Sequence, residues 1–135
     1  HPQPRPPHHI NPVHRPAAGH QLRKLSHGHI LSYVPGLQAA KAGNTAAVNT
    51  AFVKTLANGV EIGKFLETAN PNNWTGDSME DMFTVHNKLT LVYAGALVGA
   101  KFQPSITDYR KAELHMQDMA DMLSKGIIAQ FPNKF

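Results

Sequence analysis

Apolar residues recur at helical spacing along three long stretches of the chain. The first stretch predicts a helix over residues 45–68, for which Asn44 or Thr45 is the expected N-cap. Its apolar face follows an i, i+4 rhythm through Val48, Phe52, Leu56 and Val60. The pair Asn70-Pro71 should end this helix, because the residue before a proline is disfavoured in helical conformation.

The second stretch predicts a helix that begins at Asp77 or Ser78 and continues to about Phe102. One face carries its larger side chains: Met79, Met82, Phe83, His86, Leu89, Tyr93 and Leu97. The C-terminal half is apolar nearly all round, which is typical of a helix buried on several sides.

The third stretch follows Pro104, which should interrupt the chain. Ser105 and Asp108 resemble a capping box at the start of a helix that runs to about Lys125, with Gly126 as its left-handed cap. Its predicted core stripe is Tyr109, Ala112, Met116, Met119, Leu123 and Ile127.

Three long helices joined by short turns predict an all-α fold, an antiparallel bundle. The apolar run 30–34 is stopped by Pro35-Gly36, so residues 30–41 are expected to form a short N-terminal helical segment that packs across it. The predicted helical bundle domain therefore spans residues 30–135.

Residues 1–29 are predicted to form an extended His/Pro-rich basic arm. Six prolines fix the backbone of this segment and remove hydrogen-bond donors: Pro2, Pro4, Pro6, Pro7, Pro12 and Pro16. Few apolar side chains are present to offset the entropy of ordering it. We expect the arm to mediate contacts with a partner.

The distribution of charge also distinguishes the N-terminal part of the chain from the C-terminal part. Residues 1–60 carry six Lys and Arg and no acid, whereas residues 61–135 carry nine acids and seven bases. The basic part suits an anionic surface, a protein partner or identical subunits. It is sparse in Lys and Arg, and the arm has no aromatic side chain to stack on bases, so we expect no dedicated nucleic-acid binding.

The histidines are the one group of residues in the sequence that indicates metal binding. Seven lie in the arm and could bind Zn²⁺ or Cu²⁺: His1, His8, His9, His14, His20, His27 and His29. Their spacing matches no closed structural site, so a solvated cationic tail with incidental metal binding remains an alternative. A haem held by His86 or His115 with a methionine is a further one.

Two GxxxG motifs, Gly59/Gly63 and Gly95/Gly99, lie in consecutive predicted helices. Small residues four apart allow two helix backbones to approach closely. We expect the two pairs to face each other or a partner subunit.

Several features favour a secreted, extracellular protein. The sequence starts with His rather than Met, and Asn73-Trp74-Thr75 is an N-glycosylation sequon in a turn-rich stretch. The longest uncharged apolar stretch, residues 89–100, is shorter than a spanning helix, so a transmembrane protein is not expected.

No serine or threonine has a recognisable His/acid context, and the chain has neither a Gly-rich phosphate loop nor a cysteine. We therefore expect a secreted non-enzymatic helical protein that acts by association with a surface, with a host partner or with itself. Metal binding by the histidine arm is the first alternative, and a bundle that carries an apolar ligand or haem is the second.

Overall fold

The structure is a computed structural model that describes residues 14–135. This range contains four helices and no strand, so the prediction of an all-α fold is confirmed for it. The helices are α1 (His14–Lys41), α2 (Thr45–Ala69), α3 (Ser78–Val98) and α4 (Phe102–Gln130).

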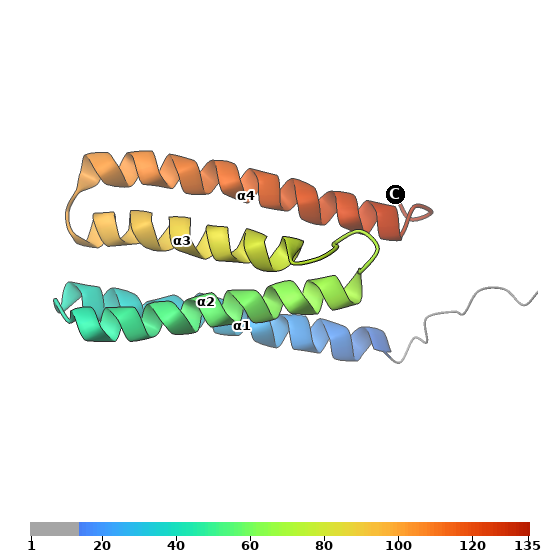
Figure 1. Ribbon diagram of the computed structural model, residues 1–135, viewed down its shortest axis with the longest axis horizontal. Helices are drawn as coiled ribbons and strands as arrows, with labels where there is room; N and C mark the ends of the chain where they lie inside the picture. Colours follow the sequence, from blue (N-terminus) through green and yellow to red (C-terminus); the bar gives the residue numbers. More distant parts are fainter. Residues whose placement is uncertain (1–13) are drawn as a thin grey trace, which may run out of the picture.

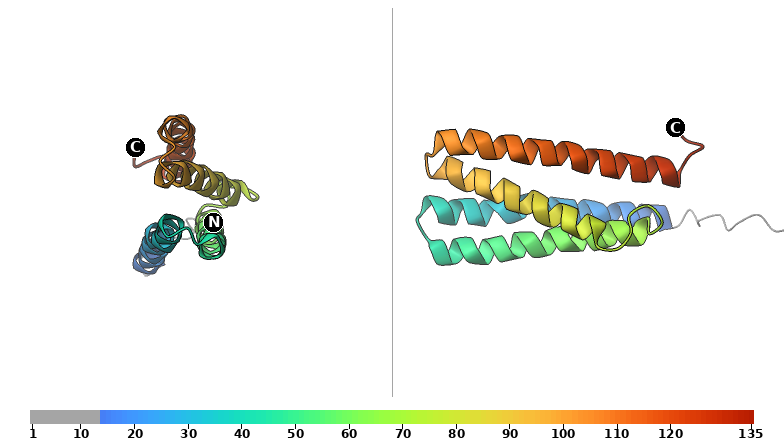
Figure 2. Two further views of the ribbon diagram at one scale, coloured as in Figure 1. Left: turned by 90° about the vertical axis from the view of Figure 1, so that its left-hand side faces the viewer. Right: turned by 45° about the horizontal axis from the view of Figure 1, so that its top comes forward.

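The chain reverses direction at each connection, so that neighbouring helices lie side by side (Figure 1). Each helix packs mainly against its neighbour in sequence, and α1 also touches α3. Among the described helices, α4 brings its backbone close only to α3. Seen from the end, α1 and α2 form one pair and α3 and α4 another (Figure 2).

Helix α1 corrects the prediction for the N-terminal part of the chain. The sequence suggests an extended arm up to residue 29 and a short helical segment over residues 30–41, but residues 14–41 form one helix of 28 residues. Pro16 lies in the first turn, where a missing N–H has no helical partner. Leu22 and Leu25 then pack against the hydrophobic core, which stabilises the helix. Residues 1–13 of the predicted arm lie outside the described residues.

Pro35 lies inside α1 instead of ending it. An interior proline removes one helical hydrogen bond and costs ~3 kcal/mol or more. Close packing against α2 offsets this cost, because a Cβ atom at Gly36 would lie only 3.3 Å from the Cβ of Ala51. Tertiary contact therefore overrides the local stop signal.

Helix α2 agrees with the prediction at both ends, α3 begins as predicted but ends at Val98, before the expected Phe102, and α4 departs from the prediction at both ends. Helix α2 begins as expected, and the Oδ1 of Asn44 accepts a hydrogen bond from the N–H of Ala47 at 3.0 Å. Helix α4 starts before Pro104, which its first turn tolerates. It also continues past Gly126, where a side chain would collide with the ring of Trp74. Gly126 is thus a packing residue and not the predicted cap.

The hydrophobic core lies toward one end of the molecule, where α2 ends and α3 begins. Its buried members come from α2, α3, α4 and the connecting loop: Ile62, Leu66, Trp74, Met79, Phe83 and Met119. At the other end, α1 passes into α2 and α3 into α4 (Figure 1). We call this second end the tip. The buried residues nearer the tip are small: Ala51, Thr55, Ser105 and Ala112.

Candidate functional site: a histidine row and an apolar tip

The histidines predicted as metal ligands separate in the structure. Three lie outside the described residues: His1, His8 and His9. Helix α1 contains His14, His20, His27 and His29. The side chains of His20 and His27 are exposed, whereas His29 is half-buried and faces α2 and α3.

His29 forms a row with His86 of α3 and His115 of α4. The ring centroids of His29 and His86 lie 5.9 Å apart, and those of His86 and His115 lie 6.4 Å apart with the rings nearly parallel. All three side chains are partly buried. We call these three residues the histidine row, and it joins three different helices.

Hydrogen bonds hold the two outer rings of the row. The Nδ1–H of His29 donates to the Oδ1 of Asn58 at 2.8 Å, and the Nε2–H of His115 donates to the carbonyl oxygen of Met82 at 3.0 Å. Two ring nitrogens of the row are buried without a hydrogen-bond partner among the described residues: Nε2 of His29 and Nδ1 of His86.

Burial keeps the rings of His86 and His29 uncharged near neutral pH. Desolvation, followed by repulsion from His29 and His115, lowers the pKa of His86 to about 4. Desolvation also lowers the pKa of His29, although its hydrogen bond to Asn58 acts in the opposite direction. Neutral imidazole retains a nitrogen lone pair, which is the form that binds metal ions.

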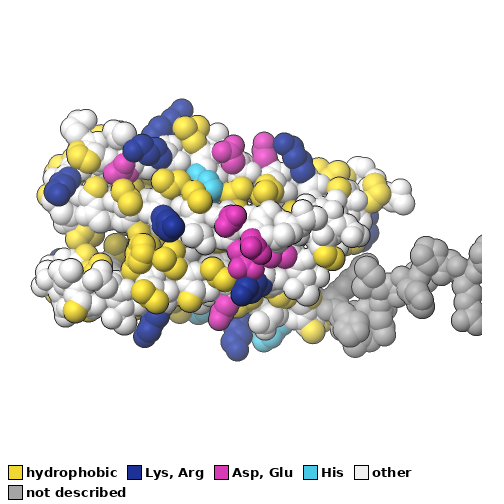
Figure 3. Space-filling view, viewed as in Figure 1, with side chains coloured by type: hydrophobic (Ala, Val, Ile, Leu, Met, Phe, Trp, Pro, Cys, Tyr) yellow, Lys and Arg dark blue, Asp and Glu magenta, His cyan; other side chains and the backbone are white. Residues whose placement is uncertain are grey.

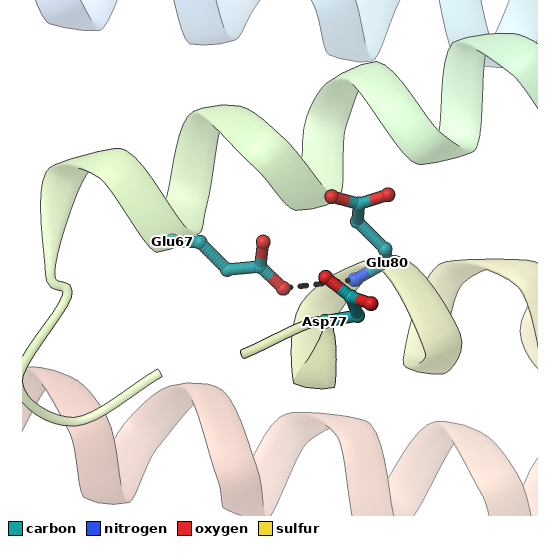
Figure 4. Close-up of side chains that lie close together, drawn as sticks. All are labelled: Glu67, Asp77 and Glu80. Atoms are coloured by element: carbon teal, nitrogen blue, oxygen red, sulfur yellow. Dashed lines mark hydrogen bonds between the residues drawn. The ribbon is translucent and has the colours of Figure 1, made fainter. Parts of the chain in front are cut away.

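A second cluster consists of the carboxylates Glu67, Asp77 and Glu80, whose oxygens lie within 4.8 Å of one another. Figure 4 shows Glu67 reaching from α2 toward the start of α3. Its Oε1 accepts hydrogen bonds from the backbone N–H groups of Met79 at 2.8 Å and Glu80 at 3.2 Å. Glu67 therefore caps the N-terminus of α3, which accounts for its position without a ligand.

The two GxxxG motifs have different surroundings. Gly59 and Gly63 are buried against α3, and a Cβ atom at Gly63 would lie 2.6 Å from the Cα of Glu80. A Cβ atom at Gly95 would meet nothing within 4 Å, and Gly99 ends α3. The two pairs do not face each other, so this part of the expectation is wrong. That Gly95 and Gly99 face a partner subunit stays a prediction.

The sequon lies in a loop that docks on α4. The Nε1–H of Trp74 donates to the carbonyl oxygen of Met122 at 3.2 Å, and the Nδ2 of Asn70 donates to that of Gly126 at 2.9 Å. Sequence reasoning noticed Trp74 only as the middle of the sequon and missed this anchoring role. Asn73 itself is exposed, and its glycosylation stays a prediction.

One small apolar cavity lies between α1, α2 and α3, lined in part by Leu37, Phe52 and Leu91. Its volume is about 50 Å³. Sites for drug-sized ligands occupy roughly 300–1,000 Å³, so this cavity is too small for haem or a lipid chain.

Large apolar side chains are exposed at the tip. Around the turn from α3 to α4 the exposed fractions are 52% for Leu97, 39% for Val98, 62% for Phe102 and 63% for Ile106. Leu37 of α1 lines a shallow groove together with Val98, so this apolar surface extends across the tip. Figure 3 shows hydrophobic side chains gathered between α2 and α3 toward this end.

The tip half of the molecule is also strongly basic. Residues 34–54 and 88–111 contain six Lys and Arg and a single acid, Asp108, whereas the rest of the chain holds seven bases and eight acids. The six bases are Lys41, Lys54, Lys88, Lys101, Arg110 and Lys111. Asp108 pairs with Lys111 at 3.3 Å and Glu113 pairs with Arg110 at 2.7 Å, which leaves the positive charge mainly on Lys41, Lys54, Lys88 and Lys101.

Comparison with protein-family models, curated proteins and solved structures finds no match for this chain. Across residues 14–135, no helix combines the length and apolar character needed to cross a membrane. The geometry of the histidine row and the composition of the tip are therefore the observations that bear on function.

Proposed function

We propose that this protein is a secreted, non-enzymatic helical protein that acts by association, and that its tip docks on an anionic lipid surface. In this proposal the four helices form an antiparallel bundle that presents the tip as a rigid unit. The observation that carries the proposal is the exposure of large apolar side chains and lysines on the same end of the molecule. Interfacial binding depends on this combination.

The apolar part of the tip supplies the insertion energy. Leu97, Phe102 and Ile106 are more than half exposed, and they surround the exposed turn between α3 and α4. Fully burying one such side chain contributes about 1.5–3 kcal/mol. Because these side chains are already partly covered, each contributes only part of this amount when it enters the acyl boundary, and the three act together.

The basic part of the tip selects the partner. Each Lys or Arg near an anionic bilayer surface contributes ~1 kcal/mol. Lys41 and Lys101 are exposed at the turns between helices, and Lys41 lines the groove together with Leu37 and Val98. Pairing of two tips would instead bring two cationic surfaces together. The charge therefore favours an anionic surface over a second copy of the chain.

Secretion is compatible with this arrangement. Asn73 is exposed in the loop between α2 and α3, which lies at the opposite end of the molecule from the tip (Figure 1). A glycan on Asn73 would leave the tip free to bind.

The test is co-sedimentation of the full chain with phosphatidylcholine vesicles that contain or lack phosphatidylglycerol. We expect binding only to the anionic vesicles, and weaker binding as salt rises. The double variant Leu97→Ser/Phe102→Ser should bind at least tenfold more weakly, a ~1.4 kcal/mol loss. Its matched control is Ile128→Ser/Phe135→Ser, which removes exposed apolar side chains at the opposite end and should bind normally.

Charge reversal separates the electrostatic contribution. Lys41→Glu/Lys101→Glu should abolish the preference for anionic vesicles, whereas Lys125→Glu/Lys134→Glu, away from the tip, should preserve it. Equal binding of both charge variants would overturn the proposal. So would wild-type protein that ignores vesicles and forms oligomers that Leu97→Ser/Phe102→Ser disrupts, a result that would assign the tip to self-assembly.

A further inference from the structure

We propose that the histidine row is a binding site for a divalent transition-metal ion, with ring nitrogens of His29, His86 and His115 as ligands. This inference is independent of lipid binding at the tip and does not involve the predicted N-terminal arm. Neutral imidazole is a preferred ligand of Zn²⁺, Cu²⁺, Ni²⁺ and Co²⁺, and these ions define the ligand class.

The hydrogen bonds of the row leave one unprotonated nitrogen on each of the two outer rings. Because Asn58 Oδ1 and the Met82 carbonyl oxygen are acceptors, His29 must carry its proton on Nδ1 and His115 on Nε2. The Nε2 of His29 and the Nδ1 of His115 then hold lone pairs. Metal-binding histidines commonly donate their other N–H to an amide or carbonyl oxygen in this way.

The orientation of Asn58 supports this tautomer assignment. Its Nδ2 donates to the carbonyl oxygen of Leu25 at 3.3 Å, so its Oδ1 is the atom directed at His29. Helix α2 thus fixes a ring that belongs to α1. The ring of His86 has the two outer rings as neighbours, and its Nδ1 is buried without a hydrogen-bond partner among the described residues.

Neighbouring rings in the row lie about 1 Å farther apart than two ligands of one shared ion would. Two imidazoles bound to one Zn²⁺ at a tetrahedral angle have centroids about 5 Å apart. The centroids of His29 and His86 lie 5.9 Å apart, and those of His86 and His115 lie 6.4 Å apart. The ring nitrogens of the three residues do not all lie within 4.8 Å of one another, so binding requires the side chains to rearrange around the ion.

Solvent can reach the row through a groove between α1 and α3. This groove has a volume of about 360 Å³, and both His29 and His86 line it together with Tyr33, Thr90 and Tyr93. Water entering from the groove can complete the coordination of an ion held by three imidazoles. The site would be an open one, in contrast to a closed structural zinc site.

The test uses the full chain, freed of metal with a chelator, and Co²⁺ and Zn²⁺ as probes. We expect Co²⁺ to give the visible absorption of a low-coordinate nitrogen site and Zn²⁺ to displace it. His29→Gln and His86→Gln should each weaken this binding at least tenfold. Asn58→Ala should weaken it roughly tenfold by releasing the ring of His29, which would mark Asn58 as a positioning residue.

A matched control separates the row from the other histidines. The variant His8→Gln/His9→Gln/His20→Gln/His27→Gln removes four of them and should keep the Co²⁺ spectrum unchanged. Loss of the spectrum in this control, or its retention in both His29→Gln and His86→Gln, would overturn the proposal. Should either single variant fail to fold, Zn²⁺-induced shifts of the imidazole ¹⁵N resonances in the wild-type chain decide: shifts confined to exposed histidines would also overturn it.

Discussion

Uncharged imidazole rings packed against one another make the fold sensitive to protons. His86 lies in the middle of the histidine row, with His29 on one side and His115 on the other. A proton added to His86 must be accommodated in a half-buried position between two other imidazole rings. The consequence is a stability that depends on pH.

We expect the metal-free chain to lose stability as pH falls from about 6.5 to about 4. Because the pKa of His86 is lowered in the folded state to about 4, the unfolded chain binds the proton first below its ordinary pKa. The contribution of neutral His86 to the free energy of unfolding is therefore fully present above pH ~6.5 and is lost as pH falls toward 4. The ring is partly exposed, so we expect a loss on the order of 1–2 kcal/mol.

Urea unfolding at a series of pH values, with a chelator present, measures this loss. His86→Gln should flatten the profile between pH 6.5 and 4, and the exposed-site control His27→Gln should leave it unchanged. A profile of the same steepness in wild type and His86→Gln would show that other groups control the acid response.

The packing of the helices depends on the positions at which their backbones can approach closely. Gly59 and Gly63 allow α3 to rest directly on α2, and Asn87 of α3 fits against Gly59. The side chain of Asn87 is fully buried and satisfied, since its Nδ2 donates to the carbonyl oxygen of Thr55 and its Oδ1 accepts from Tyr33. The close approach at the glycines and the hydrogen bonds of Asn87 together fix the positions of α1, α2 and α3 relative to one another.

Gly63→Ala should destabilise the fold by about 1–3 kcal/mol, because the new methyl group would meet the backbone of Met79 and Glu80 at 2.6–2.8 Å. The same substitution at Gly95 is the matched control. Gly95 is exposed with nothing within 4 Å, so Gly95→Ala should stabilise its helix by ~0.5–1 kcal/mol. Thermal or urea denaturation measures both, and a similar effect at the two positions would contradict this account.

Helical periodicity predicts α2, α3 and α4 because each carries a long apolar stripe. It fails for the N-terminal half of α1, where histidines and prolines conceal a weaker stripe of Leu22, Leu25, His29 and Tyr33 at 3-4-4 spacing. The predicted core stripe of α4 is only partly correct. Ala112 and Met119 are buried, whereas Tyr109 and Met116 are exposed. Which apolar face a helix buries depends on its neighbours, and a single sequence does not contain that information.

The histidine row escaped the sequence analysis for the same reason. His86 and His115 could be placed on helix faces, but His29 belonged to a segment expected to be extended. The loop anchor at Trp74 and the apolar tip depend on contacts between distant parts of the chain, which no local pattern reports. The Gly59/Gly63 motif was visible because its spacing is local.

Packing is uneven along the long axis of the protein. The buried cluster of large side chains lies where α2 passes into α3, and only small buried residues lie toward the tip. Exposed apolar side chains are frequent at the tip, where the buried residues are small. One end therefore supplies stability while the other remains available for contact.

Hydrogen exchange should reveal this difference. We expect amides of residues 59–69, 79–87 and 112–126 to exchange slowly, and those of residues 34–41 and 92–106 to exchange faster through local opening, because fewer buried contacts hold the latter. Mass spectrometry of peptides after timed exchange gives the comparison. Uniform protection along all four helices would contradict an unevenly packed fold.

The order of the helices in space repeats their order along the chain. Each helix needs only a short loop to reach its main neighbour, so little loop-closure entropy is lost at each step of assembly. Helical proteins dominated by such local contacts fold in microseconds to milliseconds. A nascent copy of this chain can thus acquire its structure progressively from the N-terminus as each hairpin emerges, without waiting for its last helix.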